Sequence, residues 1–279
     1  MQLGIFAKTF SRPTFGQTLD AVAGHGLRCI QFNFACVGLP TLPERIEPLV
    51  VENIQRDTAA RQIHIAAVSG TFNLIHPEVE QRRDGLRRLA VLAAACAGLG
   101  APVLTLCTGT RDSADMWRRH ADNDSPSAWR DLLTSLDVAL TAAEAHDVTL
   151  GIEPETANVV DSARKCRRLL DELKSPRLKV VMDAANLLHP GKLHRMPEIL
   201  DEAFDLLGPD IVLAHAKELG PDGLPDGRGA GRGIIDWDHC LARLRRNQAT
   251  GTIIMHGLNE AEVPASVNFL LGKLEVDRD

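Results

Sequence analysis

The chain lacks several features that would assign it to a class of protein. Its 279 residues include no Tyr, and its six cysteines form no Cys-x-x-Cys pair, which argues against a structural zinc knuckle. No apolar run reaches 18 residues, and the N-terminus has no basic segment followed by a long apolar one. These absences argue against a membrane span and a secretory signal. We therefore expect a cytoplasmic protein without a membrane partner.

An excess of basic charge is also missing. The chain has 31 Lys and Arg against 37 Asp and Glu, a net charge of −6. A general nucleic-acid-binding surface needs Lys and Arg in excess on one face, so we expect no nucleic-acid partner. A local basic pocket for a phosphate is still compatible with this balance.

Strand and helix patterns alternate along the whole chain, which predicts an α/β fold with a parallel sheet. Eight such units, in a chain of the length of one barrel, favour a single (β/α)8 TIM barrel over residues 1–279. An open doubly wound sheet would usually carry a glycine-rich loop after its first strand, and residues 6–10 contain no glycine. The expected strands are 3–7, 27–34, 63–69, 102–107, 148–153, 178–183, 210–216 and 251–256. The expected helices are 15–25, 44–61, 78–99, 126–147, 160–173, 196–207, 236–247 and 261–273.

Three long loops follow predicted strands, at residues 36–43, 108–125 and 220–233. The last contains six glycines and two prolines in 14 residues, so it should form neither helix nor strand. Loops that follow barrel strands lie on the face where barrel active sites are built.

Residues with metal-ligand chemistry end four successive apolar runs: Glu153, Asp183, His215 and His256. Parallel strands of a barrel end at one face, so these side chains should converge on one divalent ion. Two carboxylates with two imidazoles suit Mn²⁺ best in this interpretation, with Mg²⁺, Co²⁺ or Zn²⁺ as alternatives. Each residue also has a structural interpretation, as a helix cap or a packed histidine. Glu155 is the rival of Glu153 as a ligand, and otherwise a substrate-facing residue.

Other predicted site residues lie on the same face. Arg111 could bind a carboxylate, a phosphate or hydroxyls of a substrate, or form a surface ion pair. Trp117 offers a stacking platform for a sugar, or simple packing. His76 could reach substrate or cap the next helix. Lys217, two residues past His215, should share its face and could stabilise an oxyanion.

Four segments carry a resemblance to a known family: 151–154 (Gly-Ile-Glu-Pro), 181–186 (Val-Met-Asp-Ala-Ala-Asn), 215–218 (His-Ala-Lys-Glu) and 231–236 (Gly-Arg-Gly-Ile-Ile-Asp). They resemble the Glu-Pro, Asp-x-x-His, His-x-Lys-Asp and Gly-x-Gly-x-(Ile/Val)-Asp motifs of the xylose isomerase-like TIM-barrel superfamily. The superfamily includes tagatose and psicose 3-epimerases, hydroxypyruvate isomerase and inosose-processing enzymes. The resemblance covers essentially the whole chain.

The resemblance implies a metal-dependent sugar isomerase or epimerase that transfers a proton next to a carbonyl of a ketose or keto-sugar. Two glutamates of the family act on opposite faces of an enediolate, and Glu153 matches the first. His256 stands where the family has the second, so it is predicted as a ligand and a candidate catalytic group with Lys217. Asn186 replaces the family's histidine and is predicted to face the substrate. The resemblance also leads us to expect a homodimer.

The two departures from the family pattern keep other functions open. A lyase or hydrolase acting on a 3-keto-glycoside needs only one such proton transfer and a general acid. An endonuclease IV-like phosphodiesterase shares the barrel but needs three zinc ions and more histidine ligands. A non-catalytic barrel that binds a sugar is the last alternative.

Overall fold

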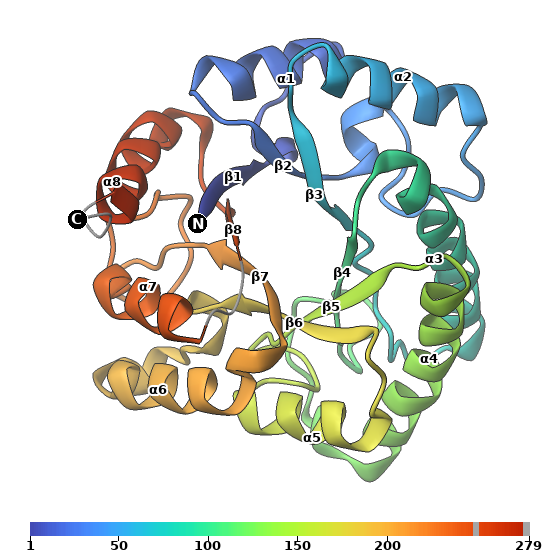
Figure 1. Cartoon of the computed structure of the whole chain (residues 1–279). Helices are drawn as coiled ribbons and strands as arrows, with labels where there is room; N and C mark the ends of the chain where they lie inside the picture. The colour runs from blue at the N-terminus through green and yellow to red at the C-terminus, as the bar shows by residue number, and fades with distance from the viewer. Residues whose placement is uncertain (248–250, 276–279) are drawn as a thin grey trace.

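The computed structural model describes residues 1–247 and 251–275. Within them, eight parallel strands follow one another around a closed barrel in chain order, and β8 pairs with β1. Figure 1 looks along the barrel axis and shows the helices as an outer ring around the strands. The fold predicted from the sequence, a single (β/α)8 TIM barrel, is confirmed.

The bounds of the elements agree closely with the expected ones. The strands are β1 Gln2–Phe6, β2 Cys29–Phe32, β3 His64–Ser69, β4 Val103–Cys107, β5 Thr149–Glu153, β6 Leu178–Asp183, β7 Ile211–Ala216 and β8 Thr252–Met255. The α-helices are α1 Phe15–Gly24, α2 Pro48–Ala59, α3 Val79–Leu99, α4 Pro126–Ala145, α5 Ala163–Leu173, α6 Met196–Leu207, α7 Trp237–Arg246 and α8 Val263–Glu275. Short 3-10 helices are η1 Ala7–Thr9, η2 Phe34–Val37, η3 Ala121–Asp124, η4 Ala185–Leu187, η5 Pro190–Arg195, η6 Gly208–Asp210 and η7 Glu260–Glu262.

The largest difference from the expected bounds is at α2, which begins at Pro48 rather than at residue 44. Two further differences have local causes. β2 ends at Phe32 rather than at residue 34, because the Asn33 side chain accepts a hydrogen bond from the Ala35 N–H at 2.9 Å and starts η2. α5 begins at Ala163 rather than at residue 160, because Ser162 caps it. None of the helices in the described part of the chain is long and apolar enough to cross a membrane.

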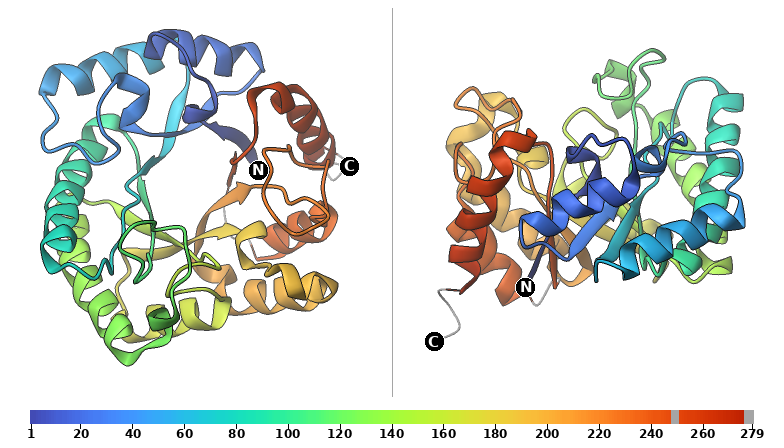
Figure 2. Two further views of the ribbon diagram at one scale, coloured as in Figure 1. Left: turned by 180° about the vertical axis from the view of Figure 1, so that it is seen from behind. Right: turned by 90° about the horizontal axis from the view of Figure 1, so that it is seen from above.

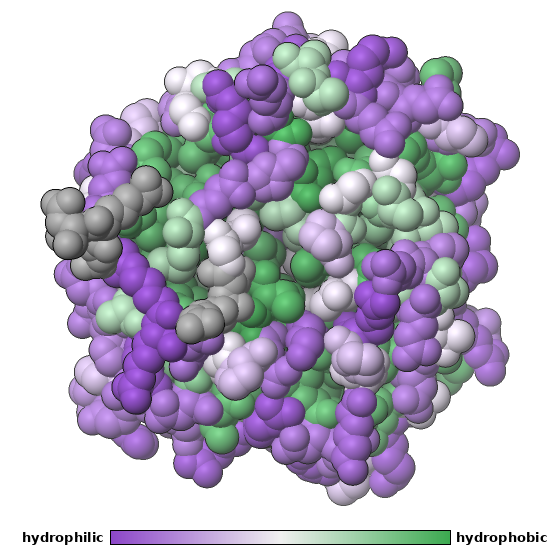
Figure 3. All heavy atoms as spheres, viewed as in Figure 1, coloured by the Kyte–Doolittle hydropathy of each residue, from purple (hydrophilic) through white to green (hydrophobic). Residues whose placement is uncertain are grey.

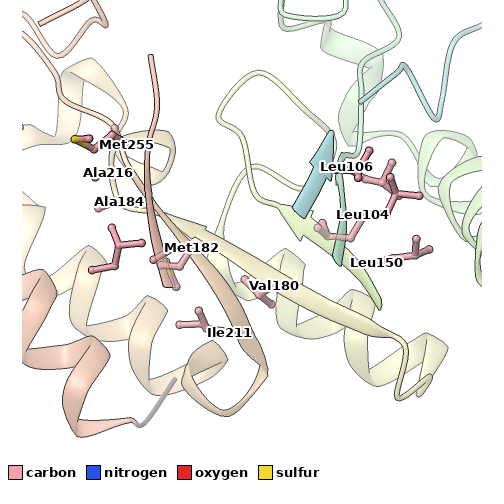
Figure 4. Packing of buried hydrophobic residues seen from close by; sticks show 14 of the residues in the cluster. Leu104, Leu106, Leu150, Val180, Met182, Ala184, Ile211, Ala216 and Met255 are labelled. Carbon is pink, nitrogen blue, oxygen red and sulfur yellow. The ribbon is translucent and has the colours of Figure 1, made fainter. Parts of the chain in front are cut away.

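The strands bury apolar side chains on both of their faces, which explains why they appear as continuous apolar runs in the sequence. The outward side chains pack against the helices in one large hydrophobic cluster. Figure 4 shows part of it, with Leu104, Leu150, Val180 and Ile211 among its labelled members. This cluster holds the helices on the barrel and fixes the direction of each strand.

A second, smaller cluster fills the inside of the barrel with Cys29, Ala67, Val103, Val181, Leu213 and Ile254. Gly4 and Gly151 complete this layer, because a Cβ built on Gly4 would meet Ile254 and one built on Gly151 would meet Val181. Each strand thus contributes one small or apolar residue to the layer. Side chains alternate along a strand, so the residue two positions later in each strand points to the same interior, one step nearer the carboxyl ends.

The next layer towards the carboxyl ends is polar except for Phe6. It contains the residues two positions beyond the apolar layer: Phe6, Gln31, Ser69, Thr105, Glu153, Asp183, His215 and His256. The long loops rise around this end, and the N-terminus lies at the opposite end (Figure 2, right). That opposite end shows hydrophobic residues at the middle of the ring (Figure 3). The fold therefore places this layer at the carboxyl ends of the strands.

The glycine-rich loop forms neither helix nor strand between Ala216 and Trp237, as predicted. It is organised around Glu218, whose buried carboxylate accepts hydrogen bonds from the Gly231 N–H, the Ile235 N–H and the Trp237 indole N–H at 2.9–3.0 Å. A buried carboxylate with three such donors is well satisfied. The loop is thus held against the end of β7, next to Lys217.

Candidate functional site

Four neighbouring strands bring the predicted ligands to one place. Glu153 and Asp183 are the last residues of β5 and β6, His215 is the residue before the end of β7, and His256 directly follows β8. Asp183 pairs with His215 in the β6–β7 ladder, and the His256 N–H donates to the Ala216 carbonyl at 3.1 Å. Strand register therefore sets these positions, which makes the site rigid.

Three of these residues form a cluster that fits a metal ion. One ligand atom each of Asp183, His215 and His256 lies within 4.8 Å of the other two. Asp183 Oδ2 and His256 Nδ1 are buried and have no hydrogen-bond partner among the described residues. Leaving such an atom unsatisfied costs about 1–3 kcal/mol, and a cation between them would remove that cost. One carboxylate and two imidazoles are the donor set of a divalent transition metal.

The protonation of His256 and Asp183 supports this use. Burial lowers the pKa of His256 to about 3, and the neighbouring His215 acts in the same direction. His256 is therefore a neutral imidazole at physiological pH, with a lone pair to offer. Burial raises the pKa of Asp183 above its usual range, and a cation beside it would favour its ionised form.

Glu153 lies beside the cluster rather than within it. Its Oε1 is 3.2 Å from His215 Nδ1 and accepts a hydrogen bond from Asn186 Nδ2 at 2.6 Å. Lys217 Nζ donates in turn to Asn186 Oδ1 at 2.6 Å. Burial works to raise the pKa of Glu153, but His215 above all, together with His256 and Lys217, outweighs burial and lowers it. Glu153 is thus an ionised carboxylate oriented by Asn186.

Glu155 has the opposite electrostatic character. Burial raises the pKa of Glu155 to about 8; Lys217 opposes the rise, and the negative charges of Glu153 and Asp183 add to it. The Glu155 side chain has no hydrogen-bond partner among the described residues. The site therefore holds one carboxylate that stays ionised and one that stays protonated near neutral pH, a combination typical of an acid–base pair.

The ring of His256 is held by stacking on both sides. It lies on the ring of Phe6, with centroids 5.3 Å apart, and on the ring of His215, with centroids 4.8 Å apart and an angle of 9°. Phe6 ends β1, which neighbours β8 in the barrel. Phe6 was not predicted as a site residue, although its place at the end of the first apolar strand is the same signal that identified the four ligands.

Gln31 is a second residue that the sequence analysis missed. It is 2% exposed, and its Oε1 lies 2.8 Å from His215 Nε2, while its Nε2 donates to Thr105 Oγ1 at 3.2 Å. A polar amide in the middle of the apolar run 29–32, two residues past an inward-facing cysteine, was the available signal. The His215 ring therefore has a partner at each nitrogen.

Three other predicted substrate residues, Arg111, His76 and Trp117, have no hydrogen bond or ion pair with this cluster among the described residues. Arg111 donates to Asp131 Oδ2 at 2.6 Å and to the Ile75 carbonyl at 3.0 Å. Both ring nitrogens of His76 face backbone groups, the Ser113 carbonyl at 3.1 Å and the Glu78 N–H at 3.1 Å, as expected for its alternative capping role. Trp117 is 55% exposed in the loop after β4. Substrate binding by Arg111, Trp117 and His76 stays a prediction.

Comparisons with known proteins agree with this architecture. The chain resembles the solved structure of 3-keto-D-glucoside 4-epimerase, YcjR, from E. coli, with a TM-score of 0.72 and 16% identity, over 98% of this chain and 99% of that one. A D-tagatose 3-epimerase-like protein gives a TM-score of 0.78 and 14% identity over 99% and 98% of the two chains. The IOLI protein with a bound zinc atom gives a TM-score of 0.74 and 14% identity, over 98% of this chain and 96% of that one.

No curated protein sequence matches the chain significantly. At such low identities, the solved structures establish the fold and not the reaction. The family model described as "Xylose isomerase-like TIM barrel" matches residues 19–271. The chain therefore belongs to the xylose isomerase-like TIM barrel family.

Proposed function

We propose that this protein is an enzyme that needs one divalent metal ion and isomerises or epimerises a ketose or keto-sugar derivative. The observation that carries the proposal is the buried cluster of Asp183, His215 and His256, in which two ligand atoms lack partners. The names of similar structures, a keto-glucoside epimerase and a tagatose epimerase-like protein, support a small sugar as the substrate class.

Each residue has a distinct part in the proposal. Asp183, His215 and His256 would hold the ion. Glu153 lies close enough to His215 that its carboxylate could bind the ion as a further ligand. When bound, the ion would polarise a carbonyl and its neighbouring hydroxyl, which makes the hydrogen on the adjacent carbon more acidic. Glu153, kept ionised and oriented by Asn186, is the group that removes this proton. Lys217, linked to Glu153 through Asn186, would stabilise negative charge on the substrate oxygen.

The place of the acid and base groups bears on the reaction type. Glu153 and Glu155 both belong to the end of β5, whereas the end of β8 carries His256 between two stacked rings. Proton transfer would then take place on one face of the substrate, which favours an isomerase with one base over an epimerase with two opposed bases. His256 acts as a ligand in this arrangement, since one of its ring nitrogens belongs to the metal cluster.

A lyase or hydrolase acting on a 3-keto-glycoside is the second proposal. The observation that favours it is Glu155, which burial keeps protonated near neutral pH and which could therefore donate a proton to a leaving group. An endonuclease IV-like phosphodiesterase has less support. The described residues contain one cluster of three possible ligands, rather than enough for three zinc ions, and the net charge is −6.

Exchange of carbon-bound hydrogen tests the proposal. Protein loaded with Mn²⁺, the ion that we expect, is incubated in heavy water with a panel of D-tagatose, D-psicose, L-ribulose, hydroxypyruvate and a 3-keto-glucoside, and deuterium uptake and products are followed by NMR. We expect metal-dependent exchange with at least one member, and loss of that exchange in Glu153→Gln. Exchange by neither protein, with tight sugar binding instead, would support the non-catalytic sugar-binding barrel. A cytoplasmic location and a homodimer stay predictions.

A further inference from the structure

The His215 ring can serve the metal cluster through only one of its nitrogens. Nδ1 is the nitrogen on the cluster side, 4.0 Å from Asp183 Oδ2 and 3.2 Å from Glu153 Oε1. A neutral imidazole that offers the Nδ1 lone pair must carry its hydrogen on Nε2. That hydrogen is buried, because the His215 side chain is 1% exposed. It therefore needs an acceptor inside the barrel.

Gln31 supplies this acceptor. Its Oε1 lies 2.8 Å from His215 Nε2, and the residue is 2% exposed, so no solvent competes for the contact. The other end of the amide is also fixed, because Gln31 Nε2 donates to Thr105 Oγ1 at 3.2 Å. A rotated amide would place an N–H group against the Nε2–H of His215 and lose that bond. Thr105 Oγ1 accepts from Gln31 Nε2 in the orientation that presents the Gln31 oxygen to His215.

The contact does not follow from sheet pairing. Gln31 belongs to β2, Thr105 to β4 and His215 to β7, and none of these strands is a neighbour of another in the barrel. The hydrogen-bond chain Thr105–Gln31–His215 therefore crosses the barrel interior at the level of the metal cluster. It reaches the cluster through Nε2 of His215.

We infer that Gln31 is a positioning residue for the metal centre: it fixes the His215 tautomer that offers Nδ1 to the ion, and Thr105 holds the other end of the Gln31 amide in place. The inference rests on the metal site of the proposed function. Partners of this kind, which hold the second nitrogen of a ligand histidine, typically contribute about 10–100-fold to metal affinity.

Titration of the metal-free protein with Co²⁺, followed by visible absorption, tests the inference without any substrate. Gln31→Met keeps the length of the side chain but removes the acceptor, and we expect Co²⁺ affinity to fall about 10–100-fold. Gln31→Glu keeps an acceptor oxygen and should bind Co²⁺ within a few-fold of the unchanged protein. Thr105→Val should lower Co²⁺ affinity less than Gln31→Met does. Gln55→Met, an exposed change on α2, is the matched control.

Two outcomes would overturn the inference. Equal Co²⁺ affinity in Gln31→Met and the unchanged protein would show that the tautomer needs no help from Gln31. NMR of the ¹⁵N-labelled, zinc-loaded unchanged protein gives a second answer even when Gln31→Met does not fold: we expect a hydrogen on His215 Nε2, and its absence would refute the inference. Failure of the unchanged protein to bind Co²⁺ is a different result, since it would refute the metal site and the proposed function with it.

Discussion

His215 and His256 stack nearly parallel, with ring centroids 4.8 Å apart and an angle of 9° between the planes. Phe6 covers the other side of His256. The stack restricts rotation of the His256 ring and keeps one of its nitrogens within 4.8 Å of a carboxylate oxygen of Asp183. His256 Nδ1 is buried and has no hydrogen-bond partner among the described residues. A histidine used only for packing would not need a nitrogen held in this position.

The role of His256 can be separated from its stacking by two substitutions. His256→Phe keeps an aromatic ring between Phe6 and His215 but removes the nitrogen, so we expect Mn²⁺ affinity to fall by more than about 100-fold, as for loss of a ligand rather than of its support. His256→Glu places a carboxylate there and should retain binding. Isothermal titration calorimetry with Mn²⁺ measures both. Unchanged affinity in His256→Phe would show that His256 is a packing residue.

Glu153 is expected to be essential for proton transfer and not for folding. Glu153→Gln keeps the shape and one acceptor oxygen for Asn186, but the amide cannot take up a proton. We expect deuterium exchange into substrate to fall by about 10²–10⁴-fold, the usual contribution of a general base. The melting temperature should stay close to that of Glu144→Gln, a matched exposed change on α4. Full activity in Glu153→Gln would remove this residue from the mechanism.

The raised pKa of Glu155 predicts that the stability of the metal-free protein depends on pH. Burial raises its pKa in the folded state to about 8, above its usual value of 4.5. The folded state therefore holds a proton that the unfolded state releases, so the contribution of Glu155 to stability is fully present below pH 4.5 and is lost as pH rises to about 8. Glu155→Gln should lose this dependence.

Urea denaturation at several pH values measures the effect. We expect the variant to become more stable than the unchanged protein by on the order of a few kcal/mol at pH 8, and less so at pH 5. A difference that stays constant between pH 5 and pH 8 would mean that Glu155 titrates normally and faces solvent.

Arg111 has two contacts within the protein, to Asp131 and to the Ile75 carbonyl, and its side chain is 12% exposed. Arg111→Met should therefore lower the free energy of unfolding by about 1–3 kcal/mol, because the carbonyl of the buried Ile75 loses its donor. Arg130→Met, an exposed change on α4, should have little effect. A large rise in KM with unchanged stability would support the substrate-binding role predicted from the sequence.

The sequence predicts the barrel and the positions of the site better than it predicts the contacts there. Apolar runs that end in Glu153, Asp183, His215 and His256 locate the layer, because strand register converts order in the chain into proximity. Gln31 and Phe6 were missed, since an amide within an apolar run and a Phe at a strand end look like packing residues. The partners of Arg111 and His76 depend on loop conformations, which have no periodic signal in the sequence.

Elemental analysis of the purified protein, made without a histidine tag, tests the central claim most directly. After incubation with Mn²⁺ and desalting, we predict one divalent ion per chain. Asp183→Asn should retain almost none, whereas Asp137→Asn, an exposed change on α4, should retain one. No ion in the unchanged protein, or one ion in Asp183→Asn, would contradict a metal centre built on Asp183, His215 and His256.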